Sequence, residues 1–133
     1  MAHALKGYDG KCAQIHGHSY ELSVTVIGKP ITDTSNPKLG MVMDFGELKA
    51  IVKAQVIDRL DHALLLNESS RGDINPSAEM FDRVEFVPYQ PTCENLLLDF
   101  AKRLRPEMPA DTKLHSLKLI ETATSFAEWF AED

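Results

Sequence analysis

The sequence lacks the features that mark most membrane, secreted and nucleic-acid-binding proteins. No apolar run in its 133 residues approaches the roughly 20 residues of a membrane-spanning helix, and no signal peptide precedes the first motif. Acidic residues outnumber basic ones by 20 to 14, which gives a net charge of −6, and the basic residues form no stripe. We therefore expect a soluble, cytoplasmic protein whose partners include neither nucleic acid nor a membrane.

Cysteine is also scarce, because the chain contains only Cys12 and Cys93. The two lie in dissimilar sequence contexts, and an intracellular protein keeps its thiols reduced, so we expect no disulfide. Hydrophobic residues make up 44% of the chain, and neither an internal repeat nor a low-complexity tract is present. These properties predict one folded domain, residues 1–133, with a modest core.

The most informative stretch is residues 12–28, which read CAQIHGHSYELSVTVIG. Its second half alternates between apolar and polar side chains, which predicts a half-buried strand over residues 19–27. Tyr20 and Leu22 point to the apolar side of this strand. When the alternation is carried backwards, it places the two histidines at 16 and 18 on that same side.

His16 and His18 are therefore candidates for a metal site. Two imidazoles at one strand end can converge on one ion, and a catalytic zinc typically takes three protein ligands and keeps one position open. His3 lies upstream as a possible third ligand, and Cys12 lies four residues before the histidine pair. The alternative remains open, because a histidine pair can arise on a strand by chance and a single cysteine is more often a small buried apolar residue.

Two helices are predicted from apolar spacing and from their first residues. Asp44 is a good N-cap residue, Glu47 lies in the first turn, and the helical spacing ends near Leu60. Thr92 is the predicted N-cap of the second helix, which Pro106 ends. Asp61 and His62 follow the first helix directly.

The remaining strands are predicted at 84–87, 113–121 and 126–131. With the strand over 19–27 they give an α+β fold, in which one antiparallel four-stranded sheet has both helices on one face. The alternation over 113–121 places four side chains on one face: His115, Leu117, Leu119 and Glu121. A carboxylate on such a face is costly unless it is paired. Lys113, Arg103 and Arg105 are the candidate structural partners.

Five motifs, in this order along the chain, resemble the 6-pyruvoyltetrahydropterin synthase family: His3 near the start, C-x-x-x-H-G-H from Cys12, Asp61-His62 after a helix, Pro-Thr-Cys-Glu-Asn at 91–95, and Glu121-Thr122. The segment Gly-Met-Val-Met-Asp-Phe at 40–45 also matches. The resemblance implies the T-fold, in which sheets of several subunits join into a barrel. It further implies a homohexamer, a dimer of trimers, with sites at the subunit interfaces.

The resemblance also implies a role for each matching residue. His3, His16 and His18 look like the ligands of a Zn²⁺ ion, and Cys12, Asp61 and His62 look like the catalytic residues. The implied substrate-binding residues are Glu121, Glu94 and Thr92. For Glu121, the chemistry agrees, because a carboxylate accepts two parallel hydrogen bonds from a pterin ring. Glu94 could equally be only an acid at a helix start.

In this chain three residues separate Cys12 from His16. This spacing resembles that of one branch of the family, the bacterial 6-carboxytetrahydropterin synthases of queuosine biosynthesis. This likeness implies conversion of 7,8-dihydroneopterin triphosphate to 6-carboxytetrahydropterin, acetaldehyde and triphosphate. The alternatives are the sister enzyme that makes 6-pyruvoyltetrahydropterin, and a non-catalytic zinc-binding module. Two features depart from the family pattern: only Met1 and Ala2 precede His3, which leaves no room for a strand before it, and the loop over 68–90 is long.

Overall fold

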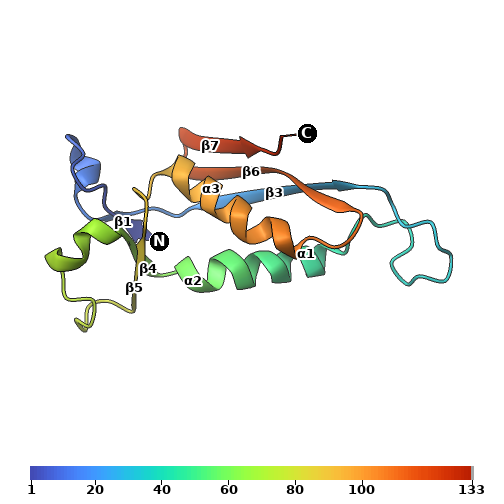
Figure 1. Ribbon diagram of the computed structural model, residues 1–133, viewed down its shortest axis with the longest axis horizontal. Coiled ribbons are helices and arrows are strands. Elements are labelled where there is room, and N and C mark those ends of the chain that lie inside the picture. Colours follow the sequence, from blue (N-terminus) through green and yellow to red (C-terminus); the bar gives the residue numbers. More distant parts are fainter. Residues whose placement is uncertain (133) are drawn as a thin grey trace.

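The computed structural model describes residues 1–132, and its elements form two sheets and a layer of helices. Figure 1 shows β3, β6 and β7 as one layer, with the helices along one of its faces and a smaller sheet at one end. The strands are β1 (Ala2–His3), β2 (His16–Gly17), β3 (Glu21–Gly28), β4 (Ala63–Asn67), β5 (Arg83–Val87), β6 (Thr112–Thr122) and β7 (Ser125–Phe130). The helices are α1 (Phe45–Val52), α2 (Asp58–Leu60) and α3 (Cys93–Leu104).

The larger sheet is antiparallel, in the order β3-β6-β7, and it forms the floor of the core. Leu22 of β3 lies opposite Leu119 of β6, so the alternation predicted for both strands places apolar side chains on the helix-facing side. The register shifts between Thr25 and Val26, and the shift bypasses His115 of β6. As a result Leu114, and not His115, turns into the core, which corrects the predicted face at that end of the strand.

Both predicted helices are confirmed. The Asp44 carboxylate accepts a hydrogen bond from the backbone N–H of Gly46 at 2.8 Å, and the helix continues from α1 through a π-helical turn, Lys53–Ile57, into α2. The hydroxyl of Thr92 caps α3 by accepting from the N–H of Asn95 at 3.2 Å. Among residues 1–132, no helix is long and apolar enough to cross a membrane. The face of α3 that packs on the sheet consists of Leu96, Leu97, Phe100 and Leu104.

The smaller sheet was not predicted, and it changes the expected arrangement. Its order is β2-β1-β4-β5, with β1 antiparallel to β2 but parallel to β4, and with β4 parallel to β5. The strand expected at 84–87 exists as β5, but it joins this mixed sheet and not a single four-stranded antiparallel one. The residues of β4 from Ala63 to Leu66 are all buried, so they show no alternation that would reveal a strand.

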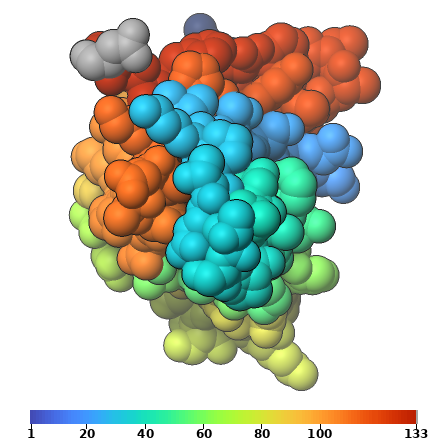
Figure 2. Space-filling model, turned by 90° about the vertical axis from the view of Figure 1, so that its right-hand side faces the viewer, coloured from blue at the N-terminus to red at the C-terminus, as the bar shows by residue number. Residues whose placement is uncertain are grey.

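The opposite end of the molecule is covered by the connection from β3 to α1. Figure 2 shows this segment, in light blue and cyan, lying across the end that faces the viewer. A Cβ atom at Gly28 would lie 2.8 Å from the carbonyl oxygen of Asp111 and 2.9 Å from Val42. Only glycine therefore allows β3 to leave the sheet so close to the start of β6.

Candidate active site

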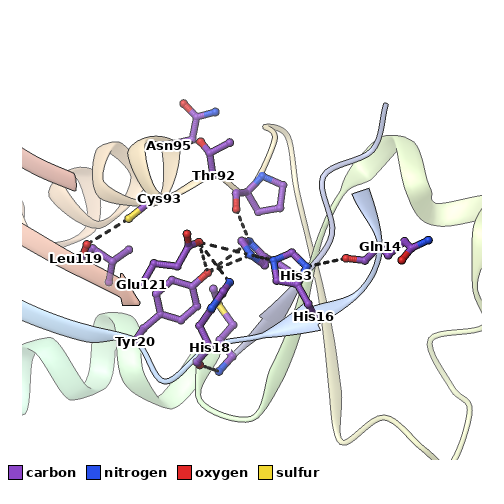
Figure 3. Close-up of polar contacts among 12 residues, drawn as sticks. His3, Gln14, His16, His18, Tyr20, Thr92, Cys93, Asn95, Leu119 and Glu121 are labelled. Carbon is purple, nitrogen blue, oxygen red and sulfur yellow. Dashed lines mark hydrogen bonds and ion pairs between the residues drawn. The ribbon is translucent and has the colours of Figure 1, made fainter. Parts of the chain in front are cut away.

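The histidine cluster lies where the smaller sheet meets the start of β3. The pairing of β1 with β2 places His3 directly opposite His16, and His18 follows two residues later on the same side. The Nε2 atoms of His3 and His16 are 2.9 Å apart, and one nitrogen of each of the three rings lies within 4.8 Å of the others. Figure 3 shows the three rings pointing toward one another. This confirms the predicted convergence, although His3 lies in a strand where none was expected.

The surroundings of the three rings fit a metal ion. The Nδ1 atom of His3 donates to the carbonyl oxygen of Pro91 at 2.7 Å, and that of His16 donates to the carbonyl oxygen of Gln14 at 2.7 Å. Since a carbonyl only accepts, both rings carry their proton on Nδ1 and offer Nε2 as a ligand. The Nε2 atom of His18 is buried and has no hydrogen-bond partner in the described part of the chain.

The distances also fit. Ligand nitrogens about 2.0–2.1 Å from a tetrahedral Zn²⁺ lie about 3.3 Å from one another, so the 2.9 Å between His3 and His16 has to open only by a few tenths of an ångström. Burial lowers the pKa of His3, against the opposing effect of its bond to Pro91, and so favours the neutral imidazole that a metal requires. The three histidines can therefore hold a metal ion.

Glu121, at the end of β6, lies beside this cluster. Its Oε1 atom is 3.7 Å from Nε2 of both His3 and His18, and it accepts a hydrogen bond from the Tyr20 hydroxyl at 3.2 Å. The Glu121 side chain is 25% exposed. In the described residues none of the three cations considered as structural partners forms an ion pair with it, and Arg103 binds a different carboxylate. Among the described residues, the alternative that one of these three cations pairs with the partly buried Glu121 is therefore wrong.

A cavity of about 460 Å³ opens next to the cluster. His18 and Tyr20 form one part of its wall, and Asp61 and His62 form another. The rest of its lining is mainly apolar, and most of it comes from the larger sheet and the helices: Met1, Ser19, Leu22, Val56, Ile57, Leu60, Leu96, Phe100 and Leu119. A mainly apolar cavity lined by a few polar groups is typical of a small-molecule site.

The predicted acid–base residues are only partly brought together. His62 Nδ1 is 3.1 Å from a carboxylate oxygen of Asp61, and both side chains are exposed, by 82% and 63%. His62 has φ 61°, a left-handed conformation that is uncommon outside glycine and is enriched at functional sites. Cys12 lies partly buried in the turn Lys11–Ala13. Within residues 1–132, its thiol has no hydrogen bond to either Asp61 or His62, and it does not line the cavity.

The two predicted residues at the start of α3 differ in their surroundings. Thr92 follows Pro91, whose carbonyl oxygen holds His3, so its backbone lies at the edge of the cluster (Figure 3). Glu94 is exposed and forms neither a hydrogen bond nor an ion pair with any described residue. A substrate-binding role for these two residues remains a prediction.

Tyr20 is the site residue that the sequence reasoning missed. Its ring stands edge-on to His3, with centroids 6.0 Å apart, and to His18, at 5.4 Å. The alternation that placed the histidines on one face also placed Tyr20 there, so the signal was present. The carbonyl groups of Pro91 and Gln14 could not have been found, because backbone atoms carry no sequence signature.

A model of the family described as 6-pyruvoyl tetrahydropterin synthase matches residues 1–132. The chain is 34% identical over 132 residues to a 6-carboxy-5,6,7,8-tetrahydropterin synthase of Haemophilus influenzae, covering 97% of this chain and 91% of the relative. A protein of the same name from Synechocystis is 34% identical over 130 residues, covering 98% and 85%. A 6-pyruvoyl tetrahydrobiopterin synthase of Dictyostelium discoideum is 32% identical over 123 residues, covering 92% and 76%.

Solved structures give the same fold. A crystal structure of an uncharacterized protein from Wolinella succinogenes aligns with a TM-score of 0.76 at 19% identity, covering 98% of this chain and 92% of that one. The 6-pyruvoyl tetrahydropterin synthase of Plasmodium vivax aligns with a TM-score of 0.70 at 22% identity, covering 99% and 90%. The predicted α+β class is thus confirmed, and so is the T-fold of the single chain, while the barrel of several subunits remains a prediction.

Proposed function

The chain belongs to the 6-pyruvoyl tetrahydropterin synthase family, and from this premise we propose that it is a zinc-dependent 6-carboxy-5,6,7,8-tetrahydropterin synthase. In this proposal it acts in the cytoplasm, in queuosine biosynthesis, and converts 7,8-dihydroneopterin triphosphate and one water molecule to 6-carboxytetrahydropterin, acetaldehyde and triphosphate. The observation that carries the proposal is the position of the Glu121 carboxylate, 3.7 Å from two of three convergent histidines. In this arrangement a carboxylate that can bind the pterin ring lies directly beside three histidines that can bind the metal.

Two observations favour the carboxy enzyme within the family. The Haemophilus and Synechocystis relatives bear that name, and they match nearly the whole chain. In addition, only three residues separate Cys12 from His16. The Dictyostelium relative, named for the pyruvoyl activity, is what favours the sister reaction as the second candidate.

In the proposed mechanism His3, His16 and His18 hold the zinc. When bound, Zn²⁺ supplies a Lewis acid that stabilises negative charge on the substrate side chain as protons leave carbon. Glu121 accepts two parallel hydrogen bonds from the amino and amide N–H groups of the pterin ring and so fixes its orientation. The mainly apolar cavity beside the histidines offers room for the rest of the substrate.

Cys12 and His62 are proposed to move the protons. Cys12 accepts a proton as a thiolate or donates one as a thiol, and Asp61, 3.1 Å from His62 Nδ1, orients the imidazole and stabilises its charged form. The exposure of Asp61 and His62, and their separation from Cys12 within one chain, support a site that a second subunit completes.

The active form in this proposal is a homohexamer, a dimer of trimers, with its sites at the subunit interfaces. β3 and β7 are the outer strands of the antiparallel sheet in the described chain, and joining such edges into a barrel removes exposed hydrogen-bonding groups. Analytical ultracentrifugation should show an oligomer, and an activity assay should find the activity in that oligomer. A stable, active monomer would contradict this part of the proposal.

The test of the activity is incubation of the zinc-loaded protein with 7,8-dihydroneopterin triphosphate, followed by mass spectrometry of the pterin product. The proposal predicts 6-carboxytetrahydropterin, whereas the sister reaction gives 6-pyruvoyltetrahydropterin. An unchanged substrate, together with loss of the fold when a chelator removes the metal, would indicate the third alternative, a structural zinc module.

A further inference from the structure

Tyr20 lies at the centre of the site, and none of the roles proposed above uses it. Its hydroxyl oxygen is 3.2 Å from Oε1 of Glu121 and 3.3 Å from Nε2 of His3. Its ring is at the same time packed edge-on against His3 and His18. Figure 3 shows Tyr20 reaching from the start of β3 to the Glu121 carboxylate and the histidines. The side chain thus contacts both halves of the site, the metal ligands and the ring anchor.

A phenol has one proton to donate, and the geometry decides where it goes. His3 Nδ1 is itself a donor to Pro91, so it cannot accept. His3 Nε2 faces the Nε2 atom of His16, 2.9 Å away, which is the direction of the metal site. The Glu121 carboxylate is the remaining acceptor, and hydrogen bonds to ionised acceptors are roughly twice as strong as neutral ones. Tyr20 therefore donates to Oε1 of Glu121.

This bond matters because, among residues 1–132, Tyr20 is the one side chain that forms a hydrogen bond with Glu121. In the described residues its other polar neighbours are two imidazoles at 3.7 Å, and no Lys or Arg forms an ion pair with it. A free glutamate side chain populates several rotamers, and ordering it costs conformational entropy. Each carboxylate oxygen accepts two hydrogen bonds, so Oε1 keeps one acceptor site after binding Tyr20 and Oε2 keeps both.

We propose that Tyr20 is a positioning residue: its hydroxyl fixes the plane of the Glu121 carboxylate beside the metal-binding histidines, so that the carboxylate accepts paired N–H groups of an incoming ring. The pterin part of this inference rests on the proposed function. The orientation of Glu121 by Tyr20 does not, because it concerns the protein without substrate.

The matched variants are Tyr20→Phe and Tyr89→Phe. Each removes one hydroxyl that donates to a carboxylate, but Tyr89 donates to Asp99, outside the site. The probe is neopterin, a pterin without the triphosphate, titrated calorimetrically into the zinc-loaded protein. Tyr20→Phe should weaken binding about tenfold with unchanged zinc content, and in turnover it should raise KM more than it lowers kcat. Tyr89→Phe should bind as the wild type does.

The same substitution in a Glu121→Gln background tests whether Tyr20 acts through Glu121. In that background Tyr20→Phe should cost little further affinity, because the carboxylate that it orients is gone. An equal loss in both backgrounds would overturn the proposal, since Tyr20 would then act independently of Glu121. Wild-type affinity in Tyr20→Phe would overturn it as well.

A crystal structure of zinc-loaded Tyr20→Phe without pterin gives a readout that needs no ligand. The Glu121 side chain should occupy more than one rotamer or turn away from His3 and His18. A Glu121 that keeps its wild-type position would overturn the proposal. If the wild-type protein binds no pterin, the proposed function fails, while the position of Glu121 in this structure still decides the role of Tyr20.

Discussion

Residues 1–132 contain two tyrosines that donate a hydrogen bond to a carboxylate, and the two pairs differ in what else the carboxylate binds. Tyr20 donates to Glu121 at the histidine cluster, and Tyr89 donates to Asp99 of α3. Burial, reinforced by the neighbouring carboxylate, raises the pKa of both phenols. Asp99, however, also accepts two hydrogen bonds from the Arg103 guanidinium, each 3.0 Å long. Glu121, besides Tyr20, has the imidazoles of His3 and His18 at 3.7 Å and no Lys or Arg partner within residues 1–132.

The difference separates a structural pair from a site prepared for a ligand. Burial would raise the pKa of Asp99, but the hydrogen bonds from Arg103 and Tyr89 outweigh it and lower the pKa. The charge of Asp99 is thus fully compensated within the fold. Glu121 is partly buried with no such cation, which is costly unless a metal ion or a donor-rich ligand completes its surroundings. We therefore expect substitutions at the two carboxylates to have opposite signatures.

The largest effect is expected at the metal that would lie beside Glu121. His16→Ala and His18→Ala should each lose the bound zinc, because two imidazoles and a water ligand hold Zn²⁺ far less tightly than three imidazoles. Metal analysis of the purified variants measures this directly. His115→Ala, which changes a histidine outside the cluster, is the control and should keep one zinc per chain. Full zinc retention in both cluster variants would remove the metal from the account.

The two cysteines also differ in their surroundings, one being buried and hydrogen-bonded and the other partly exposed. Cys93 is buried, its thiol donates to the carbonyl oxygen of Leu119, and burial, with Glu121 as the next cause, raises its pKa to about 11. Cys12 is partly exposed and has no such bond. Cys12→Ala should therefore keep fold and zinc but lose turnover by about 10²–10⁴-fold, the usual scale of an acid–base residue. Cys93→Ala should retain turnover, and near-normal activity of Cys12→Ala would exclude Cys12 from the mechanism.

Glu121→Gln is the next largest test. The substitution keeps the size of the side chain but places an N–H group where the pterin also has one. Pterin binding should weaken by about 2–4 kcal/mol, the scale of a broken charge-assisted pair. Titration with neopterin measures the loss, while circular dichroism and metal analysis should find fold and zinc unchanged. Equal affinity in Glu121→Gln and the wild type would show that Glu121 is not the anchor.

Asp99→Asn should give the reverse pattern. Removing the charge leaves Arg103 partly buried without its partner, so the free energy of unfolding should fall by about 1–3 kcal/mol. Chemical denaturation measures this change. Pterin affinity should remain that of the wild type, because Asp99 lies outside the site. A loss of affinity comparable to that of Glu121→Gln would erase the proposed distinction between the two pairs.

The smallest effect is expected in how the contribution of Asp99 to the free energy of unfolding depends on pH. The pKa of Asp99 is lowered by folding, so its contribution is fully present above the unfolded value of about 4 and is lost as the pH falls through the folded value. The difference in unfolding free energy between the wild type and Asp99→Asn should therefore be constant near neutral pH and shrink in acid. A difference that grows as the pH falls below about 4 would have the wrong sign.

Much of this arrangement could be predicted from the sequence, where alternation or capping residues reported on local structure. The face shared by His16, His18 and Tyr20 follows from the period of a strand, and both helix starts follow from Asp44 and Thr92. The smaller sheet could not be predicted in this way. β1 and β2 are only two residues long, and Ala63–Leu66 of β4 are all buried, so neither length nor periodicity distinguishes these three strands. The partly exposed β5 is the exception, because it lies where a strand is predicted.

The site shows the same limit. Glu121 was singled out because a carboxylate continued an apolar face, and the structure placed it beside the histidines. The relation of Cys12 to Asp61 and His62 depends on contacts across long stretches of chain, and in the proposal on a second subunit. Residue spacing along the chain does not report such long-range contacts, so the joint role of Cys12, Asp61 and His62 rests on the family resemblance.

The central claim is tested most directly by measuring acetaldehyde and triphosphate together during turnover of 7,8-dihydroneopterin triphosphate by the zinc-loaded protein. Acetaldehyde can be followed with a coupled alcohol dehydrogenase, and triphosphate by ion chromatography. If the chain is the carboxy enzyme, both products appear in equal amounts, and Cys12→Ala forms neither above a trace. Triphosphate without acetaldehyde would contradict the carboxy assignment, and the absence of both would contradict the proposed activity altogether.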